Sequence, residues 1–292
     1  MTSLRLPGLW PAWPGRCLLC GRWQAHSLCQ ACCAAWMRQP ARCLRCALPL
    51  PHAQPSDEAC TTCQDQAPWF DRAITAFDYA PPWSGLIARL KFSSQPALAS
   101  PLARLLAQAV ARRPHPVDLI APIPLSQARL RERGYNQSWL LARHAVRHLA
   151  RHLTRHPAPH ASQAPVASSA QLAPHLLWRP RQAERLMHLS AEARLQAIEG
   201  SFELHARAPE VHGRHVVLVD DVLTTGATVN EAARVLHEAG ARSISVWVLA
   251  RTPAPERTPP LNAAASARRP AHPFPGAPSG PPARPPSDRG SP

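Results

Sequence analysis

The chain has 292 residues, 45% of them apolar, so it can fold into one or two domains with a buried core. This composition excludes a wholly disordered protein. The formal net charge of +15 points to polyanionic partners, either nucleic acid or phosphorylated metabolites. A GC-rich genome that encodes arginine freely would give the same excess.

The sequence predicts no membrane insertion. It has no apolar run of the roughly 18 residues that a transmembrane helix requires. The first 16 residues contain three prolines and lack the apolar segment of a signal peptide. We therefore expect a cytoplasmic protein.

Changes in composition divide the chain into three parts. Residues 1–66 are rich in Cys, Trp and Pro, whereas residues 67–251 alternate between strand and helix patterns. Residues 252–292 are rich in Pro, Ala and Arg and are expected to be disordered, because they offer too little apolar surface to bury. A Pro/Ala/Ser/His segment at about 156–173 predicts a flexible insertion in the middle part.

Eight of the nine cysteines form four C-x-x-C pairs in the first part. The paired residues are Cys17, Cys20, Cys29, Cys32, Cys43, Cys46, Cys60 and Cys63. Tetrahedral Zn²⁺ takes four thiolates, so the pairs predict two structural zinc sites in a double zinc-ribbon-like domain. Such a small module has little core, and the metal would supply its folding energy.

The spacing of the pairs leaves their partners open. The first pair can combine with the second and the third with the fourth, or the two sites can be cross-braced. Cys33 is left over as a spare thiol, or as a competitor of Cys32. Disulfides are the less favoured alternative in a cytosolic chain.

Strand and helix patterns alternate in the middle part. Strands are predicted over residues 73–79, 117–123, 215–219 and 243–249. Helices are predicted over residues 86–92, 98–111, 138–153 and 229–239, and Gly240 closes the last of these. This alternation implies an α/β fold with a parallel sheet that helices cover on both faces.

The chain has a single lysine, Lys91. Arginine does not replace a lysine that acts as a compact point charge, so this residue is a candidate ligand contact, although its survival by chance is an equal alternative. Its neighbours do not form the G-x-x-x-x-G-K-[ST] motif, which excludes a P-loop ATPase.

Arg129, Arg131 and Arg133 follow the strand predicted at 117–123. Guanidinium groups suit phosphate oxygens, and a solvated basic turn is the alternative. Tyr135 and Asn136 come next and are candidates either for the site or for packing and capping. The following helix carries rows of arginine and histidine, which predict a DNA-backbone contact, a metal site or a solvated outer face.

The strongest motif starts in an apolar strand at Val216 and ends at Thr228. Asp220 and Asp221 follow the apolar residues, at the end of a strand where ligands bind in open α/β sheets. Next comes a turn of small residues, made of Thr224, Thr225, Gly226, Ala227 and Thr228. Its backbone amides, its threonine hydroxyls and the start of a helix can surround one phosphate.

The two carboxylates would repel a phosphate placed beside them. They suit sugar hydroxyls or a Mg²⁺ ion instead. Thr228 and Glu231 fit a capping box at the start of the helix.

The stretch from Val216 to Thr228 resembles the phosphoribosyl-diphosphate loop of type I phosphoribosyltransferases. The chain from about Cys17 to Arg251 resembles the ComF (competence protein F) family. The resemblance rests on the cysteine pairs, on the segment that ends at Lys91 and Phe92, and on the segments 122–125 and 129–137. It implies a zinc-ribbon-like start joined to a phosphoribosyltransferase-like fold, and a role in DNA uptake during natural transformation.

The resemblance also implies further site residues. Asp220 and Asp221 would be catalytic, and Pro122, Ile123 and Pro124 would lie in a pyrophosphate loop. The chain departs from the family where Ser126 replaces a frequent His, and where Ala183, Leu186 and Ala197 replace polar residues of a mobile flap.

Three functions remain open at this point. The chain binds a phosphoribosyl ligand or single-stranded DNA in DNA uptake, or it is an active phosphoribosyltransferase of nucleotide metabolism. The third alternative is a non-enzymatic adaptor whose zinc ribbons dock a helicase-like, DNA-handling partner.

Overall fold

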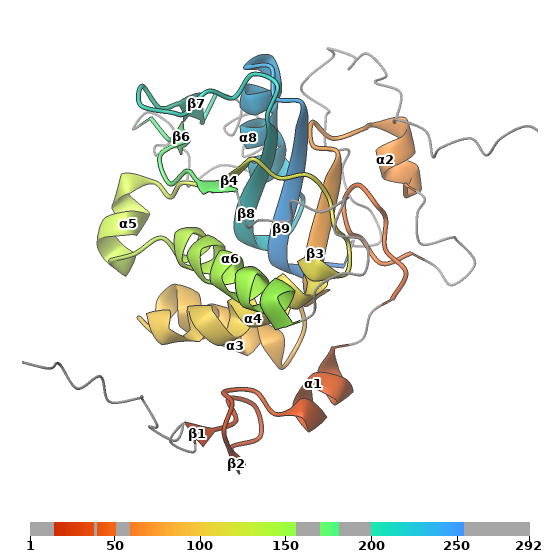
Figure 1. Cartoon of the computed structure of the whole chain (residues 1–292), viewed down its shortest axis with the longest axis vertical. Helices are drawn as coiled ribbons and strands as arrows, with labels where there is room; N and C mark the ends of the chain where they lie inside the picture. Colours follow the sequence, from red (N-terminus) through yellow and green to blue (C-terminus); the bar gives the residue numbers. More distant parts are fainter. Residues whose placement is uncertain (1–14, 38–39, 51–58, 156–169, 181–199, 254–292) are drawn as a thin grey trace, which may run out of the picture.

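The computed structural model describes residues 15–37, 40–50, 59–155, 170–180 and 200–253 (Figure 1). The tail from residue 254 onward and residues 156–169 of the expected insertion lie outside the described residues, as do the flap positions 183, 186 and 197. Within the described ranges, no helix is both long and apolar enough to cross a membrane.

A five-stranded parallel sheet forms the centre of the molecule (Figure 1). Its order is β3 (Arg72–Asp78), β9 (Ser243–Arg251), β8 (His215–Leu223), β4 (Leu119–Pro122) and β5 (Gln171–Leu172). All four neighbouring pairs run parallel, as the alternation of strand and helix patterns predicts. The residues of β5 belong to the end of the segment expected as a flexible insertion, so that end is part of the sheet.

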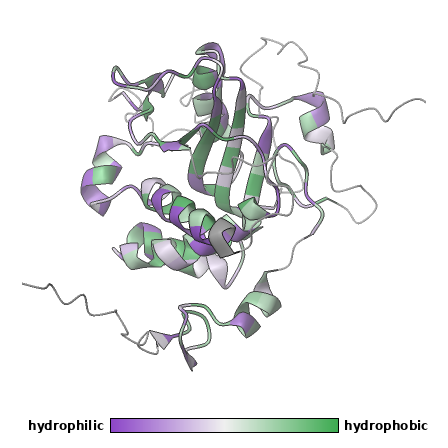
Figure 2. Ribbon diagram, viewed as in Figure 1, coloured by the Kyte–Doolittle hydropathy of each residue, from purple (hydrophilic) through white to green (hydrophobic). Residues whose placement is uncertain are grey.

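Helices cover both faces of this sheet (Figure 1). On one face, α3 (Trp83–Phe92), α4 (Ala99–Ala111) and α6 (Gln137–Arg155) pack on side chains that include Val217, Val219 and Trp247. On the other face, α8 (Ala227–Glu238) packs on Val216, Leu218 and Val246. Both faces of the central strands are therefore apolar. The strands are nearly continuous hydrophobic runs, drawn largely in green in Figure 2.

Shorter elements complete the described chain. They are β1 (Gly15–Arg16), β2 (Trp23–Gln24), α1 (Gln30–Trp36), α2 (Thr61–Asp65), the 3₁₀ helix η1 (Pro96–Leu98), α5 (Gln127–Arg133), β6 (Leu177–Trp178) and β7 (Glu203–Leu204).

Strand β8 is longer than the sequence pattern predicts. The apolar run indicates an end at Val219, but β8 continues to Leu223 because β9 pairs with it as far as Arg251. Asp220 and Asp221 therefore lie within the strand rather than after it. Tertiary pairing extends a strand here through residues whose own composition indicates a loop.

The two halves of the cysteine-rich part contact different regions of the α/β fold. Near the first two cysteine pairs, the indole Nε1 of Trp83 donates to the carbonyl of Trp36 at 2.9 Å, which joins α1 to α3. Near the third pair, Arg42 lies 2.8 Å from Asp78, and the amide of Ala73 donates to the carbonyl of Leu44 at 3.3 Å. The second half thus lies along β3, at the edge of the sheet.

Candidate functional site

The chain reverses its direction of travel through the sheet between β4 and β8. From β4 it passes through α6 on one face to β5, and from β8 it passes through α8 on the other face to β9. The segments that follow the carboxyl ends of β4 and β8 therefore run to opposite faces of the sheet. Open α/β sheets bind ligands at such a switch point, which selects this edge before any side chain is considered.

The turn after β8 has an exposed outer surface. Thr224 and Thr225 are exposed, whereas Gly226 is buried. The φ angle of Gly226 is 85°, in the left-handed region that glycine occupies without strain, and α8 starts at the next residue. Among the described residues, no acceptor bonds the backbone amides of Thr224, Thr225 and Gly226. These amides are available to a ligand.

The capping box expected at Thr228 and Glu231 is wrong. Gly226 occupies the N-cap position of α8 and has no side chain to cap it, and Oγ1 of Thr225 accepts the amide of Ala227 at 3.3 Å. Thr228 lies inside the first turn of the helix. The buried carboxylate of Glu231 instead accepts the amide of Gly200 at 2.8 Å and binds the guanidinium of Arg234. The capping-box pattern failed because Gly200, which lies far from α8 in the sequence, supplies the amide that Glu231 accepts.

Asp220 and Asp221 have different surroundings. Asp220 is half-buried, and its Oδ1 accepts the hydroxyl of Ser138 at 2.9 Å and the amide of Asp221 at 2.8 Å. Asp221 is buried, with 3% of its surface exposed, and its Oδ1 lies 2.9 Å from the ammonium of Lys91. Its Oδ2 has no hydrogen-bond partner among the described residues. The structure therefore brings three sequence-predicted site residues together: Asp220, Asp221 and Lys91.

The pKa of Asp220 is raised to about 7. Burial is the main cause, because it disfavours the charged form, and the adjacent charge of Asp221 raises the pKa further. The bonds from the Asp221 amide and from Ser138, together with the charge of Lys91, oppose this shift. One carboxyl of the pair thus titrates near neutral pH.

The end of β4 lies beside the acidic pair. Pro122 is opposite Val219 in the sheet, and the amide of Ile123 donates to the carbonyl of Val219 at 2.9 Å. The carbonyl of Ile123 in turn accepts the side-chain amide of Asn136 at 3.0 Å. Pro124 follows and is half-buried. The expected pyrophosphate segment therefore stands next to β8 at the switch point.

The arginines after β4 lie on the short helix α5, which Ser126 caps through the amide of Arg129 at 3.4 Å. Arg129 and Arg131 are exposed. Arg133 is less available, since its guanidinium donates to the side chain of Gln137 and lies 5.6 Å from the ring centroid of Phe92. Only two of the three arginines are thus open to solvent.

Tyr135 and Asn136 take the structural roles that the sequence left open. The hydroxyl of Tyr135 donates to the carbonyl of Leu90 and ties the start of α6 to α3. The side-chain oxygen of Asn136 accepts the amides of Ser138 at 2.8 Å and Trp139 at 3.2 Å, and so caps α6.

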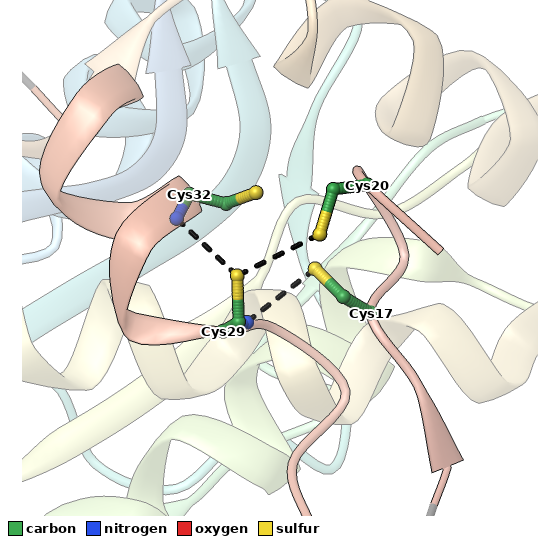
Figure 3. Close-up of side chains that lie close together, drawn as sticks. All are labelled: Cys17, Cys20, Cys29 and Cys32. Atoms are coloured by element: carbon green, nitrogen blue, oxygen red, sulfur yellow. Dashed lines mark hydrogen bonds between the residues drawn. The ribbon is translucent and has the colours of Figure 1, made fainter. Parts of the chain in front are cut away.

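The cysteines form two clusters that could each hold a metal ion. Cys17, Cys20, Cys29 and Cys32 make the first cluster (Figure 3), and Cys43, Cys46, Cys60 and Cys63 make the second. The four sulfurs of each cluster lie within 4.8 Å of one another. The pairs therefore combine in sequential order, which decides between the arrangements that the spacing left open. Cys33 belongs to neither cluster, and burial raises the pKa of its thiol.

The geometry of both clusters fits a tetrahedral metal site. A metal–sulfur distance of about 2.3 Å requires sulfurs about 3.8 Å apart in a tetrahedron. The Sγ atoms of Cys20 and Cys29 are 3.8 Å apart, and those of Cys46 and Cys60 are 3.6 Å apart. Backbone amides also point at the sulfurs: the amide of Cys60 lies 3.2 Å from Sγ of Cys43. All cysteines are free of disulfides.

Two residues at this edge escape the sequence analysis. The sequence predicts only that a helix starts at Ser138, and the nearby Asn136 is the available signal for a further role. For Arg251, the sequence predicts only that the α/β part ends there. It is buried, and its guanidinium donates to the carbonyls of Leu223 and Cys46, each at 2.9 Å, and to that of Thr224. No local sequence pattern predicts the partners of a buried arginine at the end of an apolar strand.

Comparison with known proteins identifies relatives of this chain. Residues 170–265 match the model of the phosphoribosyl transferase domain family. The DNA utilization protein YhgH of Escherichia coli is 37% identical over 250 residues, which cover 82% of this chain and 98% of that protein. Competence protein F of Haemophilus influenzae is 35% identical over 197 residues, covering 66% of this chain and 78% of that one. The chain belongs to the ComF family.

A shorter similarity joins this ComF family member to ribose-phosphate pyrophosphokinase 2 of Archaeoglobus fulgidus, at 51% identity over 43 residues, or 15% of this chain and 16% of that one. Among solved structures, that of the allosteric regulatory enzyme of purine biosynthesis matches with a TM-score of 0.32 and 18% identity over 56% of this chain and 30% of that one. This structural likeness is too weak to support an argument.

Proposed function

We propose that this ComF family member binds phosphoribosyl diphosphate together with Mg²⁺ at the switch point between β4 and β8, and that it acts in DNA uptake. The observation that carries the proposal is the placement, at one edge of the sheet, of the acidic pair and of three backbone amides that no described residue bonds. The names of its relatives support the DNA role.

The turn at Thr224, Thr225 and Gly226 suits the phosphate of the ribose. Its amides can donate to phosphate oxygens, and the two exposed threonine hydroxyls lie beside them. The start of α8 adds a favourable dipole for an anion. The similarity to a ribose-phosphate pyrophosphokinase agrees with a phosphorylated ribose as the ligand.

The acidic pair suits the cation and the sugar. Oδ2 of Asp221 is buried without a partner among the described residues, and a hard cation prefers such a carboxylate oxygen. Mg²⁺, when bound, neutralises part of the charge of the diphosphate. Asp220 accepts from Ser138 through Oδ1 and leaves its other oxygen for a ribose hydroxyl.

Cationic side chains would hold the diphosphate. Lys91 reaches the acidic pair from α3, and its side chain retains 23% exposure. Arg129 and Arg131 extend from α5, beside the proposed pyrophosphate segment at Pro122, Ile123 and Pro124. A lysine ammonium provides a point charge, whereas the arginine forks can each bind two phosphate oxygens.

Calorimetric titration of phosphoribosyl diphosphate and Mg²⁺ into the full, metal-loaded chain tests this proposal. We expect saturable binding that depends on Mg²⁺ and that weakens at least about tenfold in the double variant Asp220→Asn with Asp221→Asn. Ribose 5-phosphate serves as the matched ligand control, since it offers the turn a phosphate but offers the cation no diphosphate. Equal affinity of the wild type and the double variant would refute the assignment.

Zinc is the metal that we propose for both cysteine clusters, because four thiolates in tetrahedral spacing are typical of structural zinc. We also propose that the protein acts in the cytoplasm. Nine cysteines free of disulfides support a reducing compartment.

Phosphoribosyl transfer is a second candidate function, supported by the pKa of Asp220 near 7. A carboxyl that titrates near neutral pH can take a proton from an attacking nucleophile. Release of pyrophosphate from phosphoribosyl diphosphate, followed with candidate bases as acceptors, tests this reaction. Binding of phosphoribosyl diphosphate without release of pyrophosphate would show that the protein binds this ligand but does not transfer its phosphoribosyl group.

Docking to DNA or to a DNA-handling partner is a third candidate. Trp23 and Trp36 flank the first cysteine cluster and are 62% and 54% exposed. The exposed Arg147 on α6 provides a basic contact for a single-stranded backbone. Fluorescence anisotropy of labelled single-stranded DNA, compared between wild type and Trp23→Ala, tests this candidate; unchanged affinity would exclude Trp23 from the interface.

A further inference from the structure

Arg251 joins the turn at Thr224, Thr225 and Gly226, the proposed phosphate turn, to the second cysteine cluster. It is the last residue of β9, and only 4% of its surface is exposed. Its Nη1 donates to the carbonyls of Leu223, at 2.9 Å, and Thr224. Its Nε donates to the carbonyl of Cys46 at 2.9 Å. A single guanidinium therefore bridges two segments that are far apart in the sequence.

The bonds to the turn decide where its amides point. In a trans peptide unit the carbonyl and the amide face opposite directions. The carbonyl of Leu223 shares a unit with the amide of Thr224, and the carbonyl of Thr224 shares one with the amide of Thr225. The amide of Thr252 also donates to the Leu223 carbonyl, at 3.0 Å, so the backbone shares in fixing the Thr224 amide. Arg251 alone among the described residues holds the Thr224 carbonyl, and it thereby turns the amide of Thr225 to the far side, where no described residue bonds it.

The bond to Cys46 depends on the second cluster. Sγ of Cys46 lies 3.6 Å from Sγ of Cys60, and the amide of Cys46 donates to Sγ of Cys43 at 3.4 Å. The core around these residues is small and consists of the buried Cys43, Cys46, Leu50 and Cys63. A metal held by the four sulfurs would therefore fix the backbone that presents the Cys46 carbonyl.

We propose that Arg251 is a positioning residue that couples metal occupancy of the second cysteine cluster to the phosphate turn. With metal present, Cys46 holds the guanidinium, and the guanidinium holds the two turn carbonyls. With metal absent, Arg251 loses its bond to Cys46 and keeps only bonds to its own side of the link, so the amide of Thr225 loses its fixed direction. The identity of the phosphate ligand rests on the proposed function, but the coupling is a property of the free chain.

The first cysteine cluster provides an internal control. Its described polar contact with the α/β fold runs from the Trp36 carbonyl to Trp83 on α3, and Arg251 bonds no residue of that cluster. Loss of metal from the first cluster is therefore expected to leave the turn unchanged. This difference separates a specific link from a general loss of stability.

Hydrogen exchange of the full chain is the first test, read at the bonded amides that follow the turn. The amide of Ala227 donates to Oγ1 of Thr225 at 3.3 Å, and the amide of Asn230 donates to the carbonyl of Gly226 at 2.8 Å. Cys60→Ser removes a sulfur from the second cluster, and Cys20→Ser removes one from the first. We expect exchange at these two amides to rise about tenfold in Cys60→Ser and to stay at the wild-type rate in Cys20→Ser. Equal rates in the two variants would overturn the coupling.

Arg251→Lys is the second test and leaves both clusters intact. Lysine keeps the charge but lacks the fork that reaches Cys46 and the turn together. We expect Arg251→Lys to raise exchange at the same two amides at unchanged metal content, and Cys60→Ser to add nothing further in this background. Wild-type exchange in metal-loaded Arg251→Lys would overturn the proposal, even if Cys60→Ser failed to fold.

Binding of phosphoribosyl diphosphate separates this inference from the proposed function. If the wild type binds the ligand, Arg251→Lys is expected to raise the dissociation constant about tenfold at full metal content. An unchanged dissociation constant would contradict the positioning role. If the wild type does not bind this ligand, the proposed function fails, and the exchange experiments still decide whether the second cluster controls the turn.

Discussion

The ammonium of Lys91 lies 2.9 Å from Oδ1 of Asp221, so the single lysine of the chain pairs with a buried carboxylate at the end of β8. Lys91 comes from α3 and Asp221 from β8, far along the sequence. The pair gives the single lysine of the chain a buried partner. It also connects α3 to the proposed ligand site.

Replacement of Lys91 tests the contribution of this pair to stability. Lys91→Met leaves the carboxylate of Asp221 buried without its counter-charge, so the free energy of unfolding should fall by about 1–3 kcal/mol. Lys91→Arg keeps the charge and should lose less. Urea denaturation of both variants at neutral pH measures the difference. Wild-type stability of Lys91→Met would show that solvent already screens the pair.

Asp220 predicts a pH dependence of stability. Its folded pKa of about 7 lies above that of an unfolded Asp, so the folded state binds the proton more tightly. The stability from this group is therefore present at low pH and is lost as the pH rises from about 4 to about 7. The wild type should lose at most about 3 kcal/mol relative to Asp220→Asn between pH 5 and pH 8.

Thermal or urea unfolding of wild type and Asp220→Asn at several pH values measures this difference. The Asn variant keeps a side-chain oxygen that can accept from Ser138, so it is a close isostere. A stability difference that did not change between pH 5 and pH 8 would contradict the raised pKa.

Gly226 predicts a local backbone requirement in the turn. With φ at 85°, Gly226→Ala places a side chain in the left-handed region, which costs about 1–2 kcal/mol. Gly85→Ala is the matched control, because Gly85 lies in α3, where an added Cβ meets no atom within 4 Å. This control should stabilise the protein by up to about 1 kcal/mol. Equal effects of the two substitutions would contradict the left-handed turn.

Metal content tests the two cysteine clusters. We expect two zinc ions per chain, measured by release into a chromogenic chelator after the thiolates are modified. Cys20→Ser and Cys60→Ser should each retain about one ion at low free zinc, because three thiolates bind more weakly than four. Loss of both ions in either single variant would indicate one shared centre instead of two separate clusters.

Much of the fold is predictable from sequence because its signals are local. Apolar runs gave the strands β3, β4, β8 and β9, and helical periodicity gave α4 and α6. Gly240 follows the C-cap residue of α8 and has a φ of 80°, so it ends the helix as the sequence predicts. The predicted ends of the elements are less accurate. Strand β8 continues through Asp220 and Asp221 because β9 pairs with it as far as Leu223.

Local sequence is enough to specify the four C-x-x-C pairs and the small-residue turn after an apolar strand, because each motif needs only neighbours a few residues apart. Which cysteine pairs combine, and that Asp221 faces Lys91, depends on the packing of distant segments. The tertiary structure also makes Gly226 the cap of α8 and places Arg251 between Cys46 and the turn. These outcomes depend on which distant groups the packed sheet brings within hydrogen-bond reach, and no local pattern encodes that choice.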